Sequence, residues 1–189
     1  MKVGIIGLPQ TGKKTLFTIL TGHAIPDQGD SGKPHVGTAD IIDPRFDTLV
    51  SMYRPKKQVR AKIDIALLPR LEKESIARGD VFKDIVDTDA VCHVVRAFED
   101  EAVYHVSGSI DPVRDVAAVN AELLFHDMLF IEKRLERIEA QLKKVKDERQ
   151  QKEQALLAKM KEHLEREQPL RLLGLAAEED ALIRSYPFI

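Results

Sequence analysis

The N-terminus of this chain carries a glycine-bearing loop between a short apolar segment and a helical pattern, and this arrangement constrains the fold more than any other feature. Residues 2–6 predict a buried strand, the loop reads GLPQTGKKT, and LFTILTG continues as a helix. Gly7 to Lys13 match G-x-x-x-x-G-K, in which the glycines let backbone amides turn toward a phosphate and the helix N-terminus adds partial positive charge. A plain strand-to-helix turn with an exposed lysine is the alternative. The context favours a phosphate-binding loop, so we expect a purine-nucleotide-binding α/β domain.

The candidate nucleotide-binding residues lie in this loop and in the first turn of the helix that follows. They are Gly7, Pro9, Gln10, Thr11, Gly12, Lys13, Lys14 and Thr15. Lys13 is expected to reach the β- and γ-phosphates as a point charge.

The residue after the loop lysine departs from the usual pattern. Ser or Thr normally stands there, because its hydroxyl ligates Mg²⁺. Here the position holds Lys14, whose ammonium cannot ligate a metal. Two interpretations remain open. Either Lys14 points to solvent and metal binding is only weakened, or its ammonium lies near the vacated metal position and neutralises phosphate charge itself.

The rest of the first hundred residues reads as alternating strands and helices. Asp43-Pro44 gives an N-cap followed by proline at the first helical position, and Pro55 ends that helix. Cys92 lies inside a continuous apolar run, which predicts a fully buried strand and a buried thiol. The predicted strands beyond the first cover residues 36–42, 61–68 and 90–98.

The segment from 113 to 168 contains neither Gly nor Pro, and Asp111-Pro112 precedes it as a helix start. Apolar residues recur at steps of four and three along its first half, the pattern of a coiled-coil seam. They are Leu124, Met128, Ile131, Leu135, Ile138, Leu142 and Val145. A second apolar set begins out of register at Leu156. Two antiparallel helices joined near residues 146–151 explain this break better than one long helix.

Composition restricts the class of partner. The 189 residues carry 29 Lys and Arg against 31 Asp and Glu, a net charge of −2. This balance indicates no general attraction to nucleic acid, so we expect no DNA sequence recognition. We also expect no membrane association, because no stretch approaches the roughly 20 apolar residues of a transmembrane helix. A single cysteine excludes an intrachain disulfide, and a cytoplasmic location is expected.

Four stretches resemble the YchF family, the Obg-like ATPases and GTPases. GLPQTGKKTLF is similar to that family's GLPNVGKSTLF, and GTADIIDPRFDTL resembles the segment after switch I. TDAVCHVVRAFEDEAVYHVSGSIDPVRDVAAVNAEL resembles its fourth-strand region and the entry to an inserted helical domain. The helical hairpin and the ending SYPF are similar to its coiled-coil domain and the lead into a fifth strand.

The resemblance implies a fold and a division into domains. The expected fold class is α/β, a P-loop NTPase three-layer fold without its last strands, carrying an inserted antiparallel α-helical coiled-coil hairpin. The expected domains are a nucleotide-binding domain over 1–112, the hairpin over 113–170 and a return segment toward the first domain over 171–189. The chain stops at Ile189, before the family's C-terminal TGS domain, so it is either an excised fragment or a short relative; the sequence does not decide between them, and the missing fifth strand favours a fragment.

The resemblance also implies ligands and partners. ATP or GTP is the expected nucleotide, and the N-x-x-E motif that reads the base lies beyond the chain. Mg²⁺ is the implied metal, and the resemblance assigns it to Asp64 and Ser31. The family's DIAGL reads DIALL here, so Leu67 replaces a glycine whose amide faces the γ-phosphate. Ribosome or RNA association follows from the resemblance alone.

Three functions compete on this sequence. The first is a YchF-type nucleotide switch with weak hydrolysis, which is our expectation. The second is a non-hydrolysing nucleotide- or phosphate-binding module that interacts through its coiled-coil hairpin, and Lys14 and Leu67 both favour it. The third is a coiled-coil scaffold whose phosphate loop is vestigial. Nucleotide-dependent stabilisation and phosphate release distinguish them.

Overall fold

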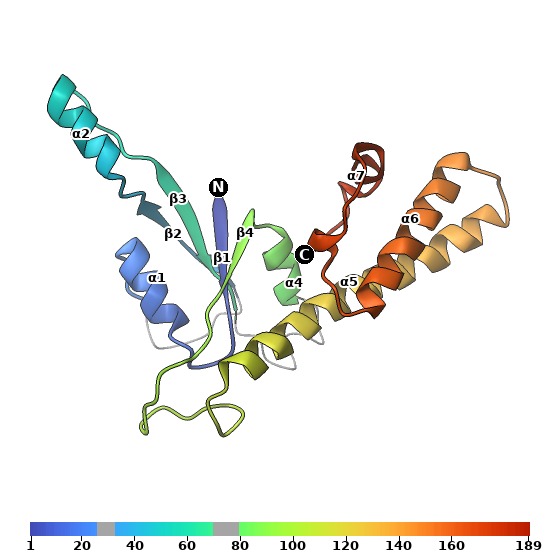
Figure 1. Ribbon diagram of the computed structural model, residues 1–189, viewed down its shortest axis with the longest axis horizontal. Helices are drawn as coiled ribbons and strands as arrows, with labels where there is room; N and C mark the ends of the chain where they lie inside the picture. The colour runs from blue at the N-terminus through green and yellow to red at the C-terminus, as the bar shows by residue number, and fades with distance from the viewer. Residues whose placement is uncertain (26–32, 70–79) are drawn as a thin grey trace. The chain divides into compact units, whose positions relative to one another are not determined.

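A computed structural model describes residues 1–25, 33–69 and 80–189. The chain forms two compact units, Met1–Pro112 and Val113–Ile189. The first contains a four-stranded sheet and the second is helical (Figure 1). Within the described residues, no helix combines the length and apolar character needed to cross a bilayer.

The sheet places the N-terminal strand at its centre. Its strand order is β2-β3-β1-β4, with β1 parallel to both neighbours and β2 antiparallel to β3. The strands are β1 (Lys2–Ile6), β2 (His35–Asp40), β3 (Lys62–Leu67) and β4 (Ala90–His93). The strands predicted over 36–42 and 61–68 are confirmed. The carboxyl end of a central parallel strand lies beside the carboxyl ends of its neighbours, and the loops that follow these strands meet there.

Both faces of the central strands are buried, which makes three layers. Ile5, Ile65 and Leu67 pack on one face with Phe17 of α1 (Lys13–Thr21). Ile6, Ala66 and Leu68, which alternate with them, are also buried. Figure 1 shows α1 and α4 (Asp80–Val86) on opposite sides of the sheet. The expected α/β three-layer class is therefore confirmed.

The prediction of a fully buried strand over 90–98 was wrong. β4 ends at His93, and Val91 and Cys92 are both exposed. The physical reason is the position of β4 as the last strand of the sheet, where only β1 pairs with it among the described strands. The apolar residues after it leave the sheet for a loop.

The helix over Pro44–Tyr53, α2, begins and ends where the sequence predicts. The side chain of Asp43 accepts a hydrogen bond from the backbone N–H of Arg45 at 2.9 Å, as an N-cap does. Arg54, in the left-handed conformation, ends the helix just before Pro55. These local signals fixed the helix even though none of its residues is buried.

The second unit is built on a helical hairpin. α5 (Pro112–Leu142) and α6 (Glu148–Glu165) are joined by residues 143–147. Arg134 forms a salt bridge with Glu153, and Glu132 forms one with Lys161. The residue with the lower number in α5 pairs with the higher number in α6, so the two helices are antiparallel. The antiparallel hairpin is confirmed, with its turn a few residues earlier than predicted, because the side chain of Asp147 caps α6.

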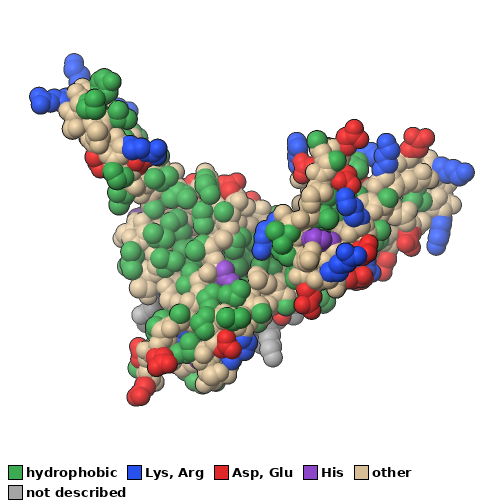
Figure 2. Space-filling model, in the orientation of Figure 1, with side chains coloured by type: hydrophobic (Ala, Val, Ile, Leu, Met, Phe, Trp, Pro, Cys, Tyr) green, Lys and Arg blue, Asp and Glu red, His purple; other side chains and the backbone are tan. Residues whose placement is uncertain are grey.

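The hairpin core matches the predicted seam from Leu124 to Leu142, but not at Val145, which lies in the turn and is exposed. Ile131 and Ile138 are fully buried against the apolar side chains of α6, which are Leu156, Leu157, Met160 and Leu164. Figure 2 shows charged side chains gathered along the helices of this unit, while hydrophobic side chains occupy much of the visible face of the first unit. A strongly charged pair of helices is thus held together by a narrow apolar stripe.

Residues 170–189 pack on the hairpin. They contain a short 3₁₀ helix, Leu170–Leu172, and the helix α7 (Ala177–Ile183). Leu170 of the first and Ile183 of the second join the hairpin core. Phe188 meets Phe130 of α5 edge-on, with ring centroids 5.2 Å apart. The expectation that this segment leads back toward the first domain stays a prediction.

A buried polar cluster fixes this packing. Arg134 forms a bidentate ion pair with Glu153 at 2.6 and 3.0 Å, and the hydroxyl of Tyr186 donates to the same carboxylate. Burial raises the pKa of Glu153, but the hydrogen bonds from Arg134 and Tyr186 outweigh it, so the pKa lies below its usual value. Glu153 is therefore charged and satisfied in the folded unit.

Ile131→Asp should destabilise the helical unit by roughly 3 kcal/mol or more, because it places a charge in a fully buried apolar seam. Urea unfolding followed by circular dichroism measures this. Ala140→Asp, at an exposed position of the same helix, is the matched control and should cost about 1 kcal/mol or less. Equal losses in the two variants would contradict the hairpin core.

The helical unit should also lose stability in acid. A carboxylate whose folded pKa is lowered stabilises the fold above its unfolded pKa, here 4.5, and loses that contribution as the pH falls through the folded pKa. Glu153→Gln should lower stability at neutral pH and flatten the dependence between about pH 5 and pH 3. Urea midpoints measured across that range test this, and an unchanged slope in the variant would refute it.

Candidate functional site

The phosphate loop follows directly from β1. Ile6 is fully buried, and the chain turns at Gly7, which has a φ of 149°. A Cβ at Gly7 would lie 2.3 Å from the carbonyl oxygen of Val94, so only glycine fits there. Gly12 has a φ of 91° and is the N-cap of α1 without a side-chain cap. The N-terminus of α1 therefore faces the loop. Because the N-cap residue is a glycine, no side chain of that residue caps the first backbone amides of the helix.

Lys13 lies inside the loop. Its side chain is buried, and its ammonium donates to the carbonyl of Leu8. The hydroxyl of Thr11 donates to the same carbonyl at 3.1 Å. These two hydrogen bonds hold the Lys13 side chain within the loop, where its ammonium can contact a bound phosphate.

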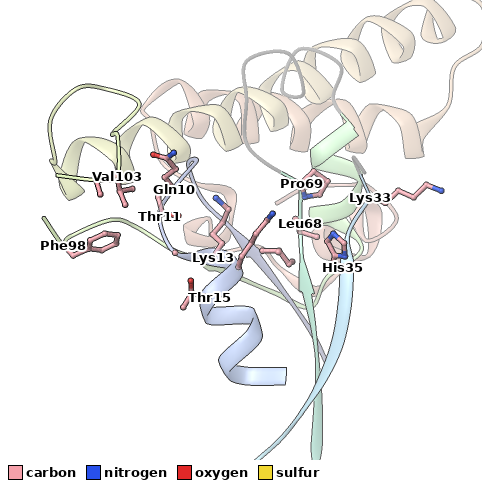
Figure 3. A pocket seen from close by; sticks show the side chains of 14 residues that line it. Gln10, Thr11, Lys13, Thr15, Lys33, His35, Leu68, Pro69, Phe98 and Val103 are labelled. Carbon is pink, nitrogen blue, oxygen red and sulfur yellow. The ribbon is translucent and has the colours of Figure 1, made fainter. Parts of the chain in front are cut away.

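A cavity of about 500 Å³ opens over this loop. Four segments line it: the loop with the start of α1, the chain entering β2, the end of β3 and the loop after β4. Figure 3 shows Phe98 and Val103 on one side of the phosphate loop, and His35, Leu68 and Pro69 on the other. The lining residues are Gln10, Thr11, Gly12, Lys13, Lys14, Thr15, Lys33, His35, Leu67, Leu68, Pro69, Phe98, Ala102 and Val103.

Basic side chains line the cavity. Three lysines, Lys13, Lys14 and Lys33, line it, and no aspartate or glutamate does so within the described chain. Lys14 is half-buried at the first turn of α1, while Lys33 is exposed. The partial positive charge of the helix N-terminus adds to these ammoniums. The arrangement attracts anions.

An apolar wall closes one side of the cavity, and Arg96 holds it. Arg96 is 2% exposed and donates to the carbonyls of Phe98 at 3.2 Å, Asp100 at 3.2 Å and Val103 at 2.9 Å. Its guanidinium also lies 4.7 Å from the centre of the Phe98 ring. One buried side chain therefore ties both ends of the loop that carries Phe98, Ala102 and Val103 into the cavity.

The structure does not bring Asp64 to the phosphate loop. Asp64 pairs with Lys2 at the opposite end of β1, and its side chain accepts a hydrogen bond from Thr38 at 3.3 Å. Gly7 lies five residues beyond Lys2, roughly 16 Å along the strand at about 3.3 Å per residue. The parallel register instead brings Leu67 and Leu68 to the loop. This register argues against Asp64 as a metal ligand at the loop, the role that the resemblance assigned to it.

The residues present do not fit Mg²⁺. The metal needs hard oxygen ligands, but Lys14 stands in place of the usual hydroxyl and no described lining residue is a carboxylate. The neutral side chains of Gln10, Thr11 and Thr15 supply the side-chain oxygens of the described lining. Across residues 1–25, 33–69 and 80–189, no group of three or more His, Cys, Asp or Glu side chains could hold a metal ion. Ser31, the other residue assigned by resemblance, lies outside the described residues.

Most of the predicted nucleotide-binding residues gather in the cavity. Residues 10–15 line it, and Gly7 and Pro9 shape the loop without lining the cavity. Sequence reasoning missed the apolar wall, His35 and Lys33, which come from segments distant in sequence. Arg96 did carry a signal, since an arginine within the apolar run VVRAF is costly to bury without hydrogen-bond partners.

Comparisons with known proteins agree with this fold and loop. The chain is 36% identical over 191 residues to the ribosome-binding ATPase YchF of Bacillus subtilis (strain 168), an alignment covering 97% of this chain and 52% of the relative. It is 37% identical over 172 residues to Obg-like ATPase 1 of Oryza sativa subsp. indica, covering 87% of this chain and 44% of the relative. No protein-family model matches the chain.

A solved structure shows the same fold. The YchF GTPase of Schizosaccharomyces pombe matches with a TM-score of 0.78 and 28% sequence identity, over 100% of this chain and 53% of that one. The chain spans about half the length of the relatives it matches.

Arg96→Ala should loosen the apolar wall, because the carbonyls of Phe98, Asp100 and Val103 lose a charged donor, and a hydrogen bond to a charged group is worth about 1.5–3 kcal/mol. Amide hydrogen exchange of residues 98–104 should accelerate at least tenfold, while exchange in the α5–α6 hairpin stays unchanged. Arg45→Ala, which removes an exposed arginine of α2, is the control. Unchanged exchange in the Arg96 variant would show that other contacts hold the wall.

Proposed function

The chain is a homologue of the YchF and Obg-like ATPases, and on that premise we propose that it binds ATP or GTP through the loop formed by residues 7–15. The observation that carries the proposal is the cavity around the buried Lys13, formed where β1 ends and α1 begins. Backbone amides at the helix N-terminus and the lysine ammonium suit a polyphosphate. The wall formed by Phe98, Ala102 and Val103 suits the less polar nucleoside.

Turnover of the bound nucleotide is proposed to be weak. Hydrolysis requires an oriented water and stabilisation of the charge that develops on the transferred phosphoryl group. Lys13 and Lys14 can supply positive charge. The end of β3 contributes only Leu67, Leu68 and Pro69, which can neither activate nor hydrogen-bond a water through their side chains. The site is built more for binding than for chemistry.

A second candidate is a non-hydrolysing module that signals through its helical unit. The absence of a carboxylate among the described lining residues favours it over catalysis. The B. subtilis relative is named a ribosome-binding ATPase, and we propose a ribosomal or RNA partner and a cytoplasmic location for this chain on that similarity. The charged surface of α5 and α6 supports an interaction role (Figure 2).

One experiment separates these functions. Thermal unfolding of the full chain is followed with ATP, GTP or no nucleotide, and phosphate release is measured in parallel. A ligand at about 100 times its dissociation constant stabilises the folded state by roughly 2.7 kcal/mol, which shifts the midpoint by several degrees. A shift with slow release supports the nucleotide switch, and a shift with no release supports the module. No shift would refute both and leave a scaffold with a vestigial loop.

Lys13→Ala should weaken nucleotide affinity at least about tenfold, because each charge-assisted hydrogen bond it makes to phosphate is worth about 1.5–3 kcal/mol. Isothermal titration calorimetry measures this. Lys62→Ala, which removes an exposed lysine of β3 outside the cavity, is the matched control and should leave affinity unchanged. Equal affinity in the parent and the Lys13 variant would refute binding at this loop.

A further inference from the structure

If the cavity binds a nucleotide as proposed, its charge balance decides which form of the nucleotide it prefers. Most proteins with a phosphate loop neutralise the β- and γ-phosphates with one lysine and a Mg²⁺ ion held by a hydroxyl and a carboxylate. This cavity has Lys13 in the first role. Lys14 stands where the hydroxyl is usual, and no carboxylate is present among the described lining residues.

Lys14 occupies the position from which a hydroxyl would hold the metal. It is the second residue of α1, it is half-buried, and it lines the same cavity as Lys13. An ammonium and a divalent cation at neighbouring sites repel each other, and the repulsion grows where the surroundings exclude water. Lys14 therefore opposes metal binding as well as failing to support it.

The strand register removes the other anchor for a metal. Leu67 pairs with Ile5 and Leu68 donates its N–H to the carbonyl of Ile5 at 3.1 Å, so the end of β3 beside the loop is apolar. Asp64 pairs with Lys2, at the end of β1 opposite to the loop. No described carboxylate lines the cavity, and a further lysine, Lys33, does.

A site with this charge distinguishes two forms of its ligand. A free nucleoside triphosphate carries about four negative charges near neutral pH, and its Mg²⁺ complex carries about two. The cationic cavity gains more from the free form, and binding of the complex brings the metal against Lys14. We propose that this cavity selects the metal-free nucleoside triphosphate, with the ammonium of Lys14 in the place of the metal.

The test is calorimetry of the full chain with ATP, once with excess Mg²⁺ and once with a chelator, at ionic strength matched with KCl. For the parent protein, excess Mg²⁺ should weaken the apparent affinity about fivefold or more. Equal affinity in the two conditions, or tighter binding with Mg²⁺, would overturn the inference while leaving nucleotide binding intact. Binding in neither condition would refute the proposed function itself, and the inference with it.

Variants at Lys14 identify the residue responsible. Lys14→Met removes the ammonium without adding a ligand, so it should weaken binding of the metal-free nucleotide and abolish the difference between the two conditions. Lys14→Ser adds the hydroxyl as well, and should reverse the order so that Mg²⁺ tightens binding. Lys62→Ser, a lysine outside the cavity, should keep the parent's ratio. A parent-like ratio in both Lys14 variants would assign the selectivity to other groups and overturn the role of Lys14.

Discussion

Parallel pairing of β1 with β3 and β4 is the constraint on which the candidate site depends. It buries Ile5 and Ile6 between two strands and fixes the point at which the chain must turn. Gly7 then passes so close to the carbonyl of Val94 that no side chain could be accommodated. The cavity over Lys13 exists because the same register brings the end of β3 and the loop after β4 to that one point.

The electrostatics of the cavity follow from this geometry. Lysines come from the phosphate loop and from the chain entering β2, while the end of β3 contributes Leu67 and Leu68 and no carboxylate. Lys14 and the apolar end of β3 act in the same direction, since the side chains of neither supply an oxygen ligand to a divalent cation. Such a site can still hold a polyphosphate, because the charge that a metal would supply is present as ammonium groups.

The helical unit is stabilised differently. Its surface is densely charged, and its cohesion comes from one apolar stripe and from the Arg134–Glu153–Tyr186 cluster, which ties α5, α6 and the C-terminal segment together. The buried carboxylate is fully satisfied by a bidentate arginine and a tyrosine hydroxyl, which limits the cost of removing it from water. Packing and polar contacts therefore select one arrangement of the two helices.

Features encoded within a few neighbouring residues could be predicted from the sequence alone. The phosphate loop is specified by glycine and lysine spacing, α2 by its Asp-Pro start, and the hairpin by a seven-residue apolar repeat with a break. The partners of Lys13 could not be predicted in this way, and neither could the exposure of Cys92 or the distance of Asp64 from the loop. Those depend on which strand lies at the sheet edge and on the register between strands some 60 residues apart. Pairing and burial across the whole sheet decide such features, because a shift in register moves every side chain of a strand while leaving its local sequence pattern unchanged.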